Sequence, residues 1–288
     1  MMKEQMIKRA VKLNEILERR GLPCRVVYNK ISIVNGKDKD AYSFESSDYN
    51  MLPILYFNKE WWAFSDAELA DYMELLFVRN ARKVNIRKYQ SKEYILSHVR
   101  PVLVSKKNIP MLEKEDIVYM YYLDMVVVFE LILKEDAEGT SAAKLKKWNL
   151  ENASEKISVE ELFLAAQKYA SDNYEVSRMD EALMSYGEER YAEDAVSSTY
   201  IVTTQNHIKG AAVMISPVVI DTLMERMDTE KIILLPASVH EMIAVPFDES
   251  KIKYLREIVK TMNETIVNTE DKLTDTVYIV SDGVISIA

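Results

Sequence analysis

Glycine, cysteine and histidine are scarce in this chain. Of its 288 residues, six are glycine, one is cysteine and three are histidine. So few glycines argue against collagen-like folds and phosphate-binding loops. One cysteine excludes an internal disulfide and a zinc site built from thiolates. The histidines, His98, His207 and His240, follow no metal-ligating pattern. We therefore expect neither a metal nor a cofactor.

Long apolar runs and a surplus of positive charge are also missing. The longest apolar stretch, Met125 to Leu133, is interrupted by Glu130 and is far shorter than the roughly 18 residues of a membrane helix. The first residues alternate charge with apolar side chains, unlike a signal peptide. The net charge is −9, which disfavours broad nucleic-acid binding. We expect an acidic, cytoplasmic protein without membrane contact.

The remaining composition and patterning indicate a globular α+β protein. Hydrophobic residues make up 48% of the chain and charged residues 29%, as in ordinary globular domains. Capping boxes at Ser65 and Ser158, and the Ser216-Pro217 pair, predict three helix starts. The strongest strand pattern runs from Tyr119 to Leu133. We predict mainly antiparallel sheets with helices packed on one face.

Further strands are expected from short apolar and β-branched runs, and they suggest how the chain is organised. An N-terminal portion, residues 1–105, and a C-terminal portion, residues 106–288, form either two domains or one continuous domain. The polar, acidic segment 171–195 reads as a loosely packed connection. The expected strands cover residues 25–29, 31–34, 42–44, 53–57, 200–204, 210–215, 232–235, 242–245, 277–280 and 284–287.

Several segments resemble an uncharacterised bacterial family that is known only as a domain of unknown function. The family shows a Gly-Ala-Ala run before a helix, a leucine-proline-small-serine-x-His-Glu stretch, and an Asn-x-Thr-x-Val segment before a final hairpin. In this chain these motifs lie at Gly210–Ala212, Leu235–Glu241 and Asn263–Val267. The strand Tyr122–Leu133, with Asp124, and the segment PILYFN at 53–58 are also similar. The resemblance implies a domain family and no activity.

The stretch IILLPASVHEMIAVP, residues 232–246, is the first place to look for a site. It brings Ser238, His240 and Glu241 within four positions between two apolar runs. On a strand, Ser238 and His240 would share a face and Glu241 would point the other way. A hydrolytic dyad needs the imidazole beside the hydroxyl and a third group to orient it. The alternative is a turn between two short strands, and we favour it because the chain has no nucleophile elbow.

Asp124 and Glu130 are the only charges in the strongest strand pattern. A buried carboxylate must find partners or take up a proton, so Asp124 is a candidate catalytic residue at the edge of a pocket. The alternative is a position at the mouth of the strand, which we favour. If 119–133 is one strand, the two carboxylates share a face but lie too far apart to act on one substrate.

The stretch from residue 79 to residue 92 is basic in an otherwise acidic chain. It could bind an acidic protein partner or a nucleic acid, or it could dock on the chain's own acidic segment. The candidate partner-binding residues are Arg79, Arg82, Lys83, Arg87 and Lys88. The acidic residues that could receive them are Glu188, Glu189, Glu193 and Asp194.

These observations favour a non-enzymatic binding or regulatory protein, since no catalytic or cofactor motif is complete. The alternatives are a small hydrolase that uses His240 with Ser238, and a protein that binds a nucleic acid or an acidic partner through residues 79–92. A protein partner is the expected class of partner, ahead of nucleic acid.

Overall fold

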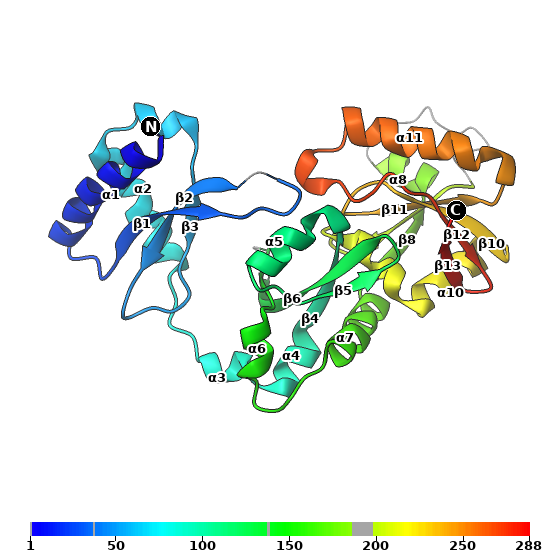
Figure 1. Cartoon of the computed structure of the whole chain (residues 1–288), viewed down its shortest axis with the longest axis horizontal. Helices are drawn as coiled ribbons and strands as arrows, with labels where there is room; N and C mark the ends of the chain where they lie inside the picture. The colour runs from blue at the N-terminus through cyan, green and yellow to red at the C-terminus, as the bar shows by residue number, and fades with distance from the viewer. Residues whose placement is uncertain (1, 37, 137–138, 186–197) are drawn as a thin grey trace. The chain divides into compact units, whose positions relative to one another are not determined.

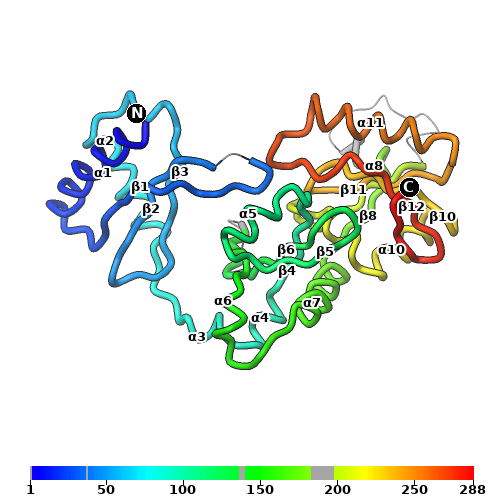
Figure 2. Tube along the Cα trace, in the orientation of Figure 1, coloured from blue at the N-terminus to red at the C-terminus, as the bar shows by residue number. Residues whose placement is uncertain are grey.

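The computed structural model describes residues 2–36, 38–136, 139–185 and 198–288 (Figure 1). Its helices and antiparallel sheets confirm the α+β class. The chain divides into two compact units, Met1–Ile86 and Arg87–Ala288, and passes from one to the other once (Figure 2). This division lies before the boundary predicted at residue 105, because the strand that ends there pairs within the second unit.

The first unit is a three-stranded antiparallel sheet with two helices. Helix α1 (Met2–Arg19) buries Met6, Leu13 and Leu17 at helical spacing. Helix α2 (Asp66–Asn80) begins at the predicted capping box, where Ser65 and Glu68 bond each other's backbone N–H. The strands, in the order β1-β2-β3, are β1 (Arg25–Ile31), β2 (Lys39–Glu45) and β3 (Ile54–Tyr56), followed by the short helix η1 (Lys59–Ala63). Residues 25–31 thus form one strand instead of the start of two.

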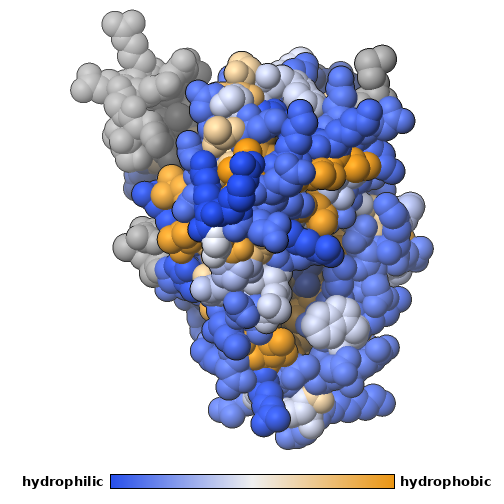
Figure 3. All heavy atoms as spheres, turned by 90° about the vertical axis from the view of Figure 1, so that its left-hand side faces the viewer, coloured by the Kyte–Doolittle hydropathy of each residue, from blue (hydrophilic) through white to orange (hydrophobic). Residues whose placement is uncertain are grey.

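Several large apolar side chains of this unit remain exposed. On α2, Tyr72, Leu75 and Val78 are 45% to 65% exposed, while Leu69 and Met73 on its other side are fully buried. On the face shown in Figure 3, hydrophobic residues form separate patches among hydrophilic ones. Scattered exposed apolar residues are common on folded proteins, so we assign them no role.

The second unit contains two antiparallel sheets. In the first, the central strand β6 pairs with β4 on one side and with β5 and β7 on the other. The predicted single strand 119–133 is therefore wrong: a tight turn at Leu123 and Asp124 divides it, with Leu123 at a φ of 53°. The strands are β4 (Val99–Ser105), β5 (Tyr119–Tyr122), β6 (Met125–Asp136) and β7 (Gly139–Lys144).

The second sheet has six strands in the order β13-β12-β10-β11-β9-β8. Its centre is the predicted hairpin, in which Leu235 pairs with Ile243. Its edge strand β8 comes from the segment predicted as a loose connection, so residues 174–178 are regular structure, whereas 186–197 lie outside the described residues. The strands are β8 (Tyr174–Arg178), β9 (Tyr200–Thr204), β10 (Lys231–Pro236), β11 (Met242–Pro246), β12 (Tyr278–Ser281) and β13 (Val284–Ile287).

Residues Gly210–Ile215 were predicted as a strand, and they form the 3-10 helix η3 instead. All six are buried, against β9, β4 and α7 (Val159–Asp172). A short apolar run that is buried on every side carries no periodicity that distinguishes a strand from a helix. Because η3 contacts strands of both sheets, it lies at the centre of the unit's core.

Helices complete the second unit, and two of their starts were predicted. Ser158 forms a capping box with Glu161 at α7, and the Ser216 hydroxyl accepts the Val219 N–H at α10. Within the described residues, no helix is both long and apolar enough to cross a membrane. The other elements are α3 (Ile86–Tyr89), α4 (Lys92–His98), η2 (Lys106–Asn108), α5 (Ile109–Lys114), α6 (Lys147–Glu151), α8 (Met179–Ser185), α10 (Pro217–Arg226), η4 (Glu249–Lys251), α11 (Ile252–Thr265) and η5 (Thr269–Asp271).

Candidate functional site

Ser238 and Glu241 close the turn between β10 and β11. The Ser238 hydroxyl accepts the backbone N–H of His240 at 3.0 Å. The Glu241 carbonyl accepts the backbone N–H groups of Ala237 and Ser238, each at 3.3 Å. The stretch 236–242 is thus the polar turn between two short strands that the sequence favoured. The structure brings the Ser238 hydroxyl to the backbone of His240 rather than to its imidazole ring.

The His240 ring bridges two other segments. Its Nδ1 accepts the backbone N–H of Lys209 at 3.2 Å, so this nitrogen carries no proton. Its Nε2 lies 3.3 Å from Asp271 Oδ1, at the end of η5. Both ring nitrogens are therefore engaged within the chain, and neither contacts Ser238.

Gly210 lies against the backbone of this turn. A Cβ at position 210 would come 2.6 Å from the His240 carbonyl oxygen and even closer to Thr203 Oγ1 and Thr204 N. The Thr203 hydroxyl donates to the same His240 carbonyl at 2.7 Å. Two motifs that are separate in the sequence, at 210–212 and 235–241, thus meet directly. Only glycine leaves room for this approach.

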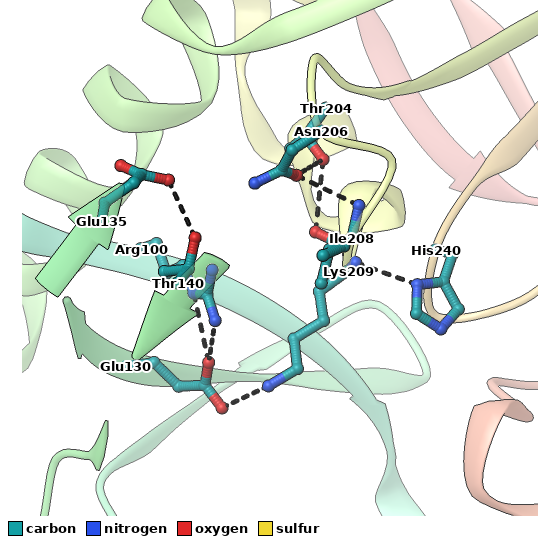
Figure 4. Close-up of polar contacts among 9 residues, drawn as sticks. All are labelled: Arg100, Glu130, Glu135, Thr140, Thr204, Asn206, Ile208, Lys209 and His240. Carbon is teal, nitrogen blue, oxygen red and sulfur yellow. Dashed lines mark hydrogen bonds and ion pairs between the residues drawn. The ribbon is translucent and has the colours of Figure 1, made fainter. Parts of the chain in front are cut away.

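A buried ion cluster lies next to this contact. Arg100, Glu130 and Lys144 stand side by side on β4, β6 and β7. Glu130 Oε2 accepts from Arg100 Nη2 at 2.9 Å and from its Nε at 3.2 Å. Glu130 Oε1 accepts from Lys209 Nζ at 2.6 Å. Figure 4 shows Lys209 reaching Glu130 with its side chain while its backbone N–H meets His240.

The charges in this cluster are unequal. Burial disfavours the ionised form of Glu130, but Lys209 and Arg100 outweigh burial and hold its pKa below the usual value. Burial lowers the pKa of the half-buried Lys144, and the attraction of Glu130 only partly offsets this. One carboxylate thus faces three basic side chains. Of these three, Lys144 is the one whose charged form the surroundings disfavour.

The loop that carries Lys209 has an unusual backbone. His207 and Lys209 adopt φ angles of 56° and 57°, which only a few per cent of non-glycine residues do. Asn206 Oδ1 accepts from the Thr204 hydroxyl at 2.9 Å and from the Ile208 N–H at 3.1 Å. These bonds fix the loop and aim Lys209 at Glu130 (Figure 4).

Asp124 lies away from this cluster, in the turn just before β6, the mouth position favoured by the sequence. Its carboxylate accepts the hydroxyls of Thr274 and Thr276, each at 2.7 Å, and that of Tyr278. Burial opposes its ionisation, but these three hydrogen bonds outweigh burial and keep its pKa below normal. Asp124 therefore joins the first sheet to strand β12 of the second. Because Asp124 is in the turn and Glu130 is on β6, the two do not share a strand face as expected.

Two adjoining cavities lie beside the ion cluster. One, of about 660 Å³, is lined by residues of α4, β6 and α7 that include His98, Glu135 and Tyr169. The other, of about 240 Å³, also contacts Glu135 and Tyr169 and reaches Thr204 and Asn206. Neither is lined by Ser238, His240 or Asp124.

Aromatic and basic side chains of the larger cavity form a stack. The rings of Tyr94 and His98 lie nearly parallel, with centroids 3.8 Å apart. Lys88 Nζ lies over the Tyr94 ring, 4.7 Å from its centroid. The Tyr94 hydroxyl donates to the Ile132 carbonyl at 3.2 Å, and burial raises its pKa, which keeps the phenol neutral. The stack is thus built into the wall of the cavity.

The basic stretch 79–92 runs across the division between the two units, so it is no single surface of one unit. Arg82 donates to the carbonyls of Ala81 and Arg79. Lys92 is paired with Glu161, 2.5 Å away. The acidic segment that could receive the stretch, 188–194, lies outside the described residues. Partner binding by Arg79, Arg82, Lys83, Arg87 and Lys88 stays a prediction.

Sequence reasoning did not find several residues of the site. Arg100, Lys209 and Asp271 contact the candidates Glu130 and His240 from distant segments, and no local pattern marks them. His98 was noticed only as one of three histidines. The sequence held one signal for Lys209: the run that resembles the family begins at Gly210, directly after it.

Comparisons with known proteins agree with the resemblance seen in the motifs. No curated protein and no solved structure matches this chain. One family model does match, over residues 6–281, and it is described as a family of unknown function, DUF5688. The match covers both units and all the motifs discussed above. The chain therefore belongs to the DUF5688 family of unknown function.

Proposed function

We propose that this chain is a non-enzymatic cytoplasmic binding protein that holds a small molecule in the cavity between α4, β6 and α7. The cavity itself carries the proposal. Its volume of about 660 Å³ falls within the range of roughly 300 to 1,000 Å³ typical of small-molecule sites. Its lining combines apolar walls, such as Leu96 and Ile132, with polar groups such as Asn173. Such a mixture both buries and orients a ligand.

The alternative, a hydrolase built on His240, receives less support from the geometry. A serine nucleophile needs a base within hydrogen-bond reach of its hydroxyl. Here the Ser238 hydroxyl accepts the His240 backbone N–H, and the imidazole contacts Lys209 and Asp271. The contacts of the His240 ring hold the β10–β11 turn to the loop before η3 and to η5.

The experiment blocks the cavity with a larger side chain and measures the binding of small molecules. Ala165 on α7 lines the cavity, and Leu164 beside it is 64% exposed to solvent. A library of small metabolites would be screened by thermal shift against the full chain and the variants Ala165→Trp and Leu164→Trp. We expect compounds that stabilise the parent chain and Leu164→Trp but not Ala165→Trp.

Circular dichroism would first show that both variants are folded. If no compound stabilises the parent chain, or if Ala165→Trp binds the same compounds equally well, the cavity is not a ligand site and the proposal is wrong.

A further inference from the structure

We infer that the ligand of this cavity carries an oxyanion group, a carboxylate or a phosphate, and that Lys88 and His98 hold that group. The inference rests on the proposed function and adds the chemistry of the ligand. It follows from the charge of the lining, the direction of the histidine, and the contacts that hold Tyr94 and His98 in place beside Lys88.

The lining is positive in a chain whose net charge is −9. Lys88, Lys134 and Lys168 face the cavity together with the acids Glu135 and Asp172. Both acids already have partners: Asp172 is 2.8 Å from Lys168, and Glu135 accepts the Thr140 hydroxyl at 3.0 Å.

Lys88 is different from the other two lysines. Its ammonium lies over the rings of Tyr89 and Tyr94, and among the described residues Lys88 forms no ion pair with a carboxylate. Because Lys88 is exposed and its described contacts are with ring faces, its ammonium donors stay available to a ligand. The group that suits such a donor best is an anion.

His98 turns its second nitrogen away from its own helix. Nδ1 lies 2.9 Å from the Ser97 hydroxyl and 3.1 Å from the Tyr94 carbonyl, both in its own helix. Nε2 is on the far edge of the ring and has no partner in the described part of the chain. When the Ser97 hydroxyl donates to Nδ1, the ring carries its proton on Nε2, and Nε2–H donates to an oxyanion.

Contacts within the chain hold Tyr94 and His98 in place before any ligand arrives. The Tyr94 ring is fixed at its hydroxyl by Ile132 and packs flat on the His98 ring. A binding group that is already ordered loses little conformational entropy when it binds. The adjoining cavity of about 240 Å³ adds Asn173, Thr204 and Asn206, whose amides and hydroxyls suit the uncharged polar part of the same ligand.

The experiment compares two anionic probes with a neutral one, benzamide, that matches the shape of benzoate. Phenyl phosphate, benzoate and the neutral benzamide would be titrated into the full chain and followed by NMR chemical shifts. We expect the first two to bind and benzamide to bind at least about tenfold more weakly, since a charge-assisted hydrogen bond is worth about one tenfold step in affinity or more. The ratio between phenyl phosphate and benzoate tells a phosphate site from a carboxylate site.

Two variants assign the site, and a third is the control. Lys88→Gln and His98→Gln should each weaken the oxyanion probes by about tenfold and leave benzamide unchanged. Lys107→Gln removes the same charge from an exposed position that does not line the cavity, and it should bind like the parent chain.

Each contrary outcome has a distinct meaning. If benzamide binds as well as benzoate and Ala165→Trp blocks both, the ligand class is wrong while the proposed function stands. If the oxyanion probes bind equally to the parent chain, Lys88→Gln and His98→Gln, the assignment of the two residues is wrong. If neither the probes nor the metabolite library binds, the proposed function itself fails.

Discussion

Lys209 Nζ lies 2.6 Å from Glu130 Oε1, and this contact joins the loop before η3 to the middle of strand β6. The same lysine meets His240 through its backbone N–H. One residue therefore connects the β10–β11 turn, which carries the family-like motif, to the buried ion cluster of the other sheet. The contribution of these contacts can be measured as the change in the free energy of unfolding when one of them is removed.

Removal of the central carboxylate should destabilise the second unit strongly. Glu130→Gln leaves Arg100 buried without its counter-ion, and breaking a buried pair in this way typically costs about 3 to 5 kcal/mol. Urea denaturation would measure the loss. Lys168→Met, which breaks the exposed Lys168–Asp172 pair, is the control and should leave stability nearly unchanged. Equal effects of the two variants would contradict a buried cluster.

The lowered pKa of Glu130 predicts that the stability of the fold depends on pH in the acid range. Burial opposes its ionisation, Lys209 and Arg100 outweigh burial, and its pKa is lower in the folded chain than in the unfolded one. The group therefore stabilises the fold above its unfolded pKa of about 4.3. That contribution is lost as the pH falls through the folded pKa. Below about pH 5, Glu130→Gln should lose less stability with falling pH than the parent chain does.

Lys144→Met should stabilise the second unit, the opposite of a usual charge deletion. Burial lowers the pKa of Lys144 in the folded chain, which means that folding disfavours its charged form at neutral pH. Methionine keeps a long side chain without that cost. The midpoint of urea denaturation should rise at pH 7 and approach that of the parent chain at a pH above the ordinary lysine pKa. A lower midpoint at pH 7 would show that Glu130 needs Lys144.

Gly210→Ala should be more harmful than an alanine at another glycine of the same unit. Its Cβ would overlap Thr203, Thr204 and the His240 carbonyl, and such overpacking costs about 1 to 3 kcal/mol or more. Gly283→Ala is the matched control: Gly283 has a φ of 71°, and the nearest atom to its Cβ is 3.7 Å away. The control should cost only about 1 to 2 kcal/mol. Thermal denaturation would rank the two, and the reverse order would be evidence against the close contact at Gly210.

His240→Ala separates the two hypotheses about the β10–β11 turn. We expect a loss of about 1 to 3 kcal/mol, because the Lys209 N–H and Asp271 lose their partner, and no effect in a broad screen for ester hydrolysis. If the parent chain hydrolyses a substrate and His240→Ala abolishes turnover at unchanged thermal stability, the chain is a hydrolase.

The sequence predicted those parts of the fold that local chemistry specifies. The capping boxes at Ser65 and Ser158 and the hairpin around residues 236–242 were found because each depends on neighbours a few positions apart. The turn at Leu123 and Asp124 was missed because no glycine marks it, and Leu123 adopts its positive φ under tertiary constraint. η3 was missed because burial on all sides removes periodicity.

The candidate site was predictable in part. The turn of Ser238 and His240 was correctly placed, whereas the partners of His240 come from Lys209 and Asp271, each 31 positions away. Glu130 stood out as a charge within a strand, but nothing local indicates that Arg100 faces it. Contacts of this kind are set by strand register and loop geometry, which a single sequence does not reveal.

The hydrogen bonds of Asp124 also bear on how the chain acquires its structure. Thr274 meets Asp124 across 150 positions, and Tyr278 meets it across 154. Contacts between such distant residues slow folding because a long loop must close first. During synthesis the turn before β6 emerges long before its hydroxyl donors, so the ribosome must release residue 278 before the two sheets can be joined there. Until then the Asp124 carboxylate lacks these donors, and the exposed apolar surface of a partly folded unit favours association with other chains.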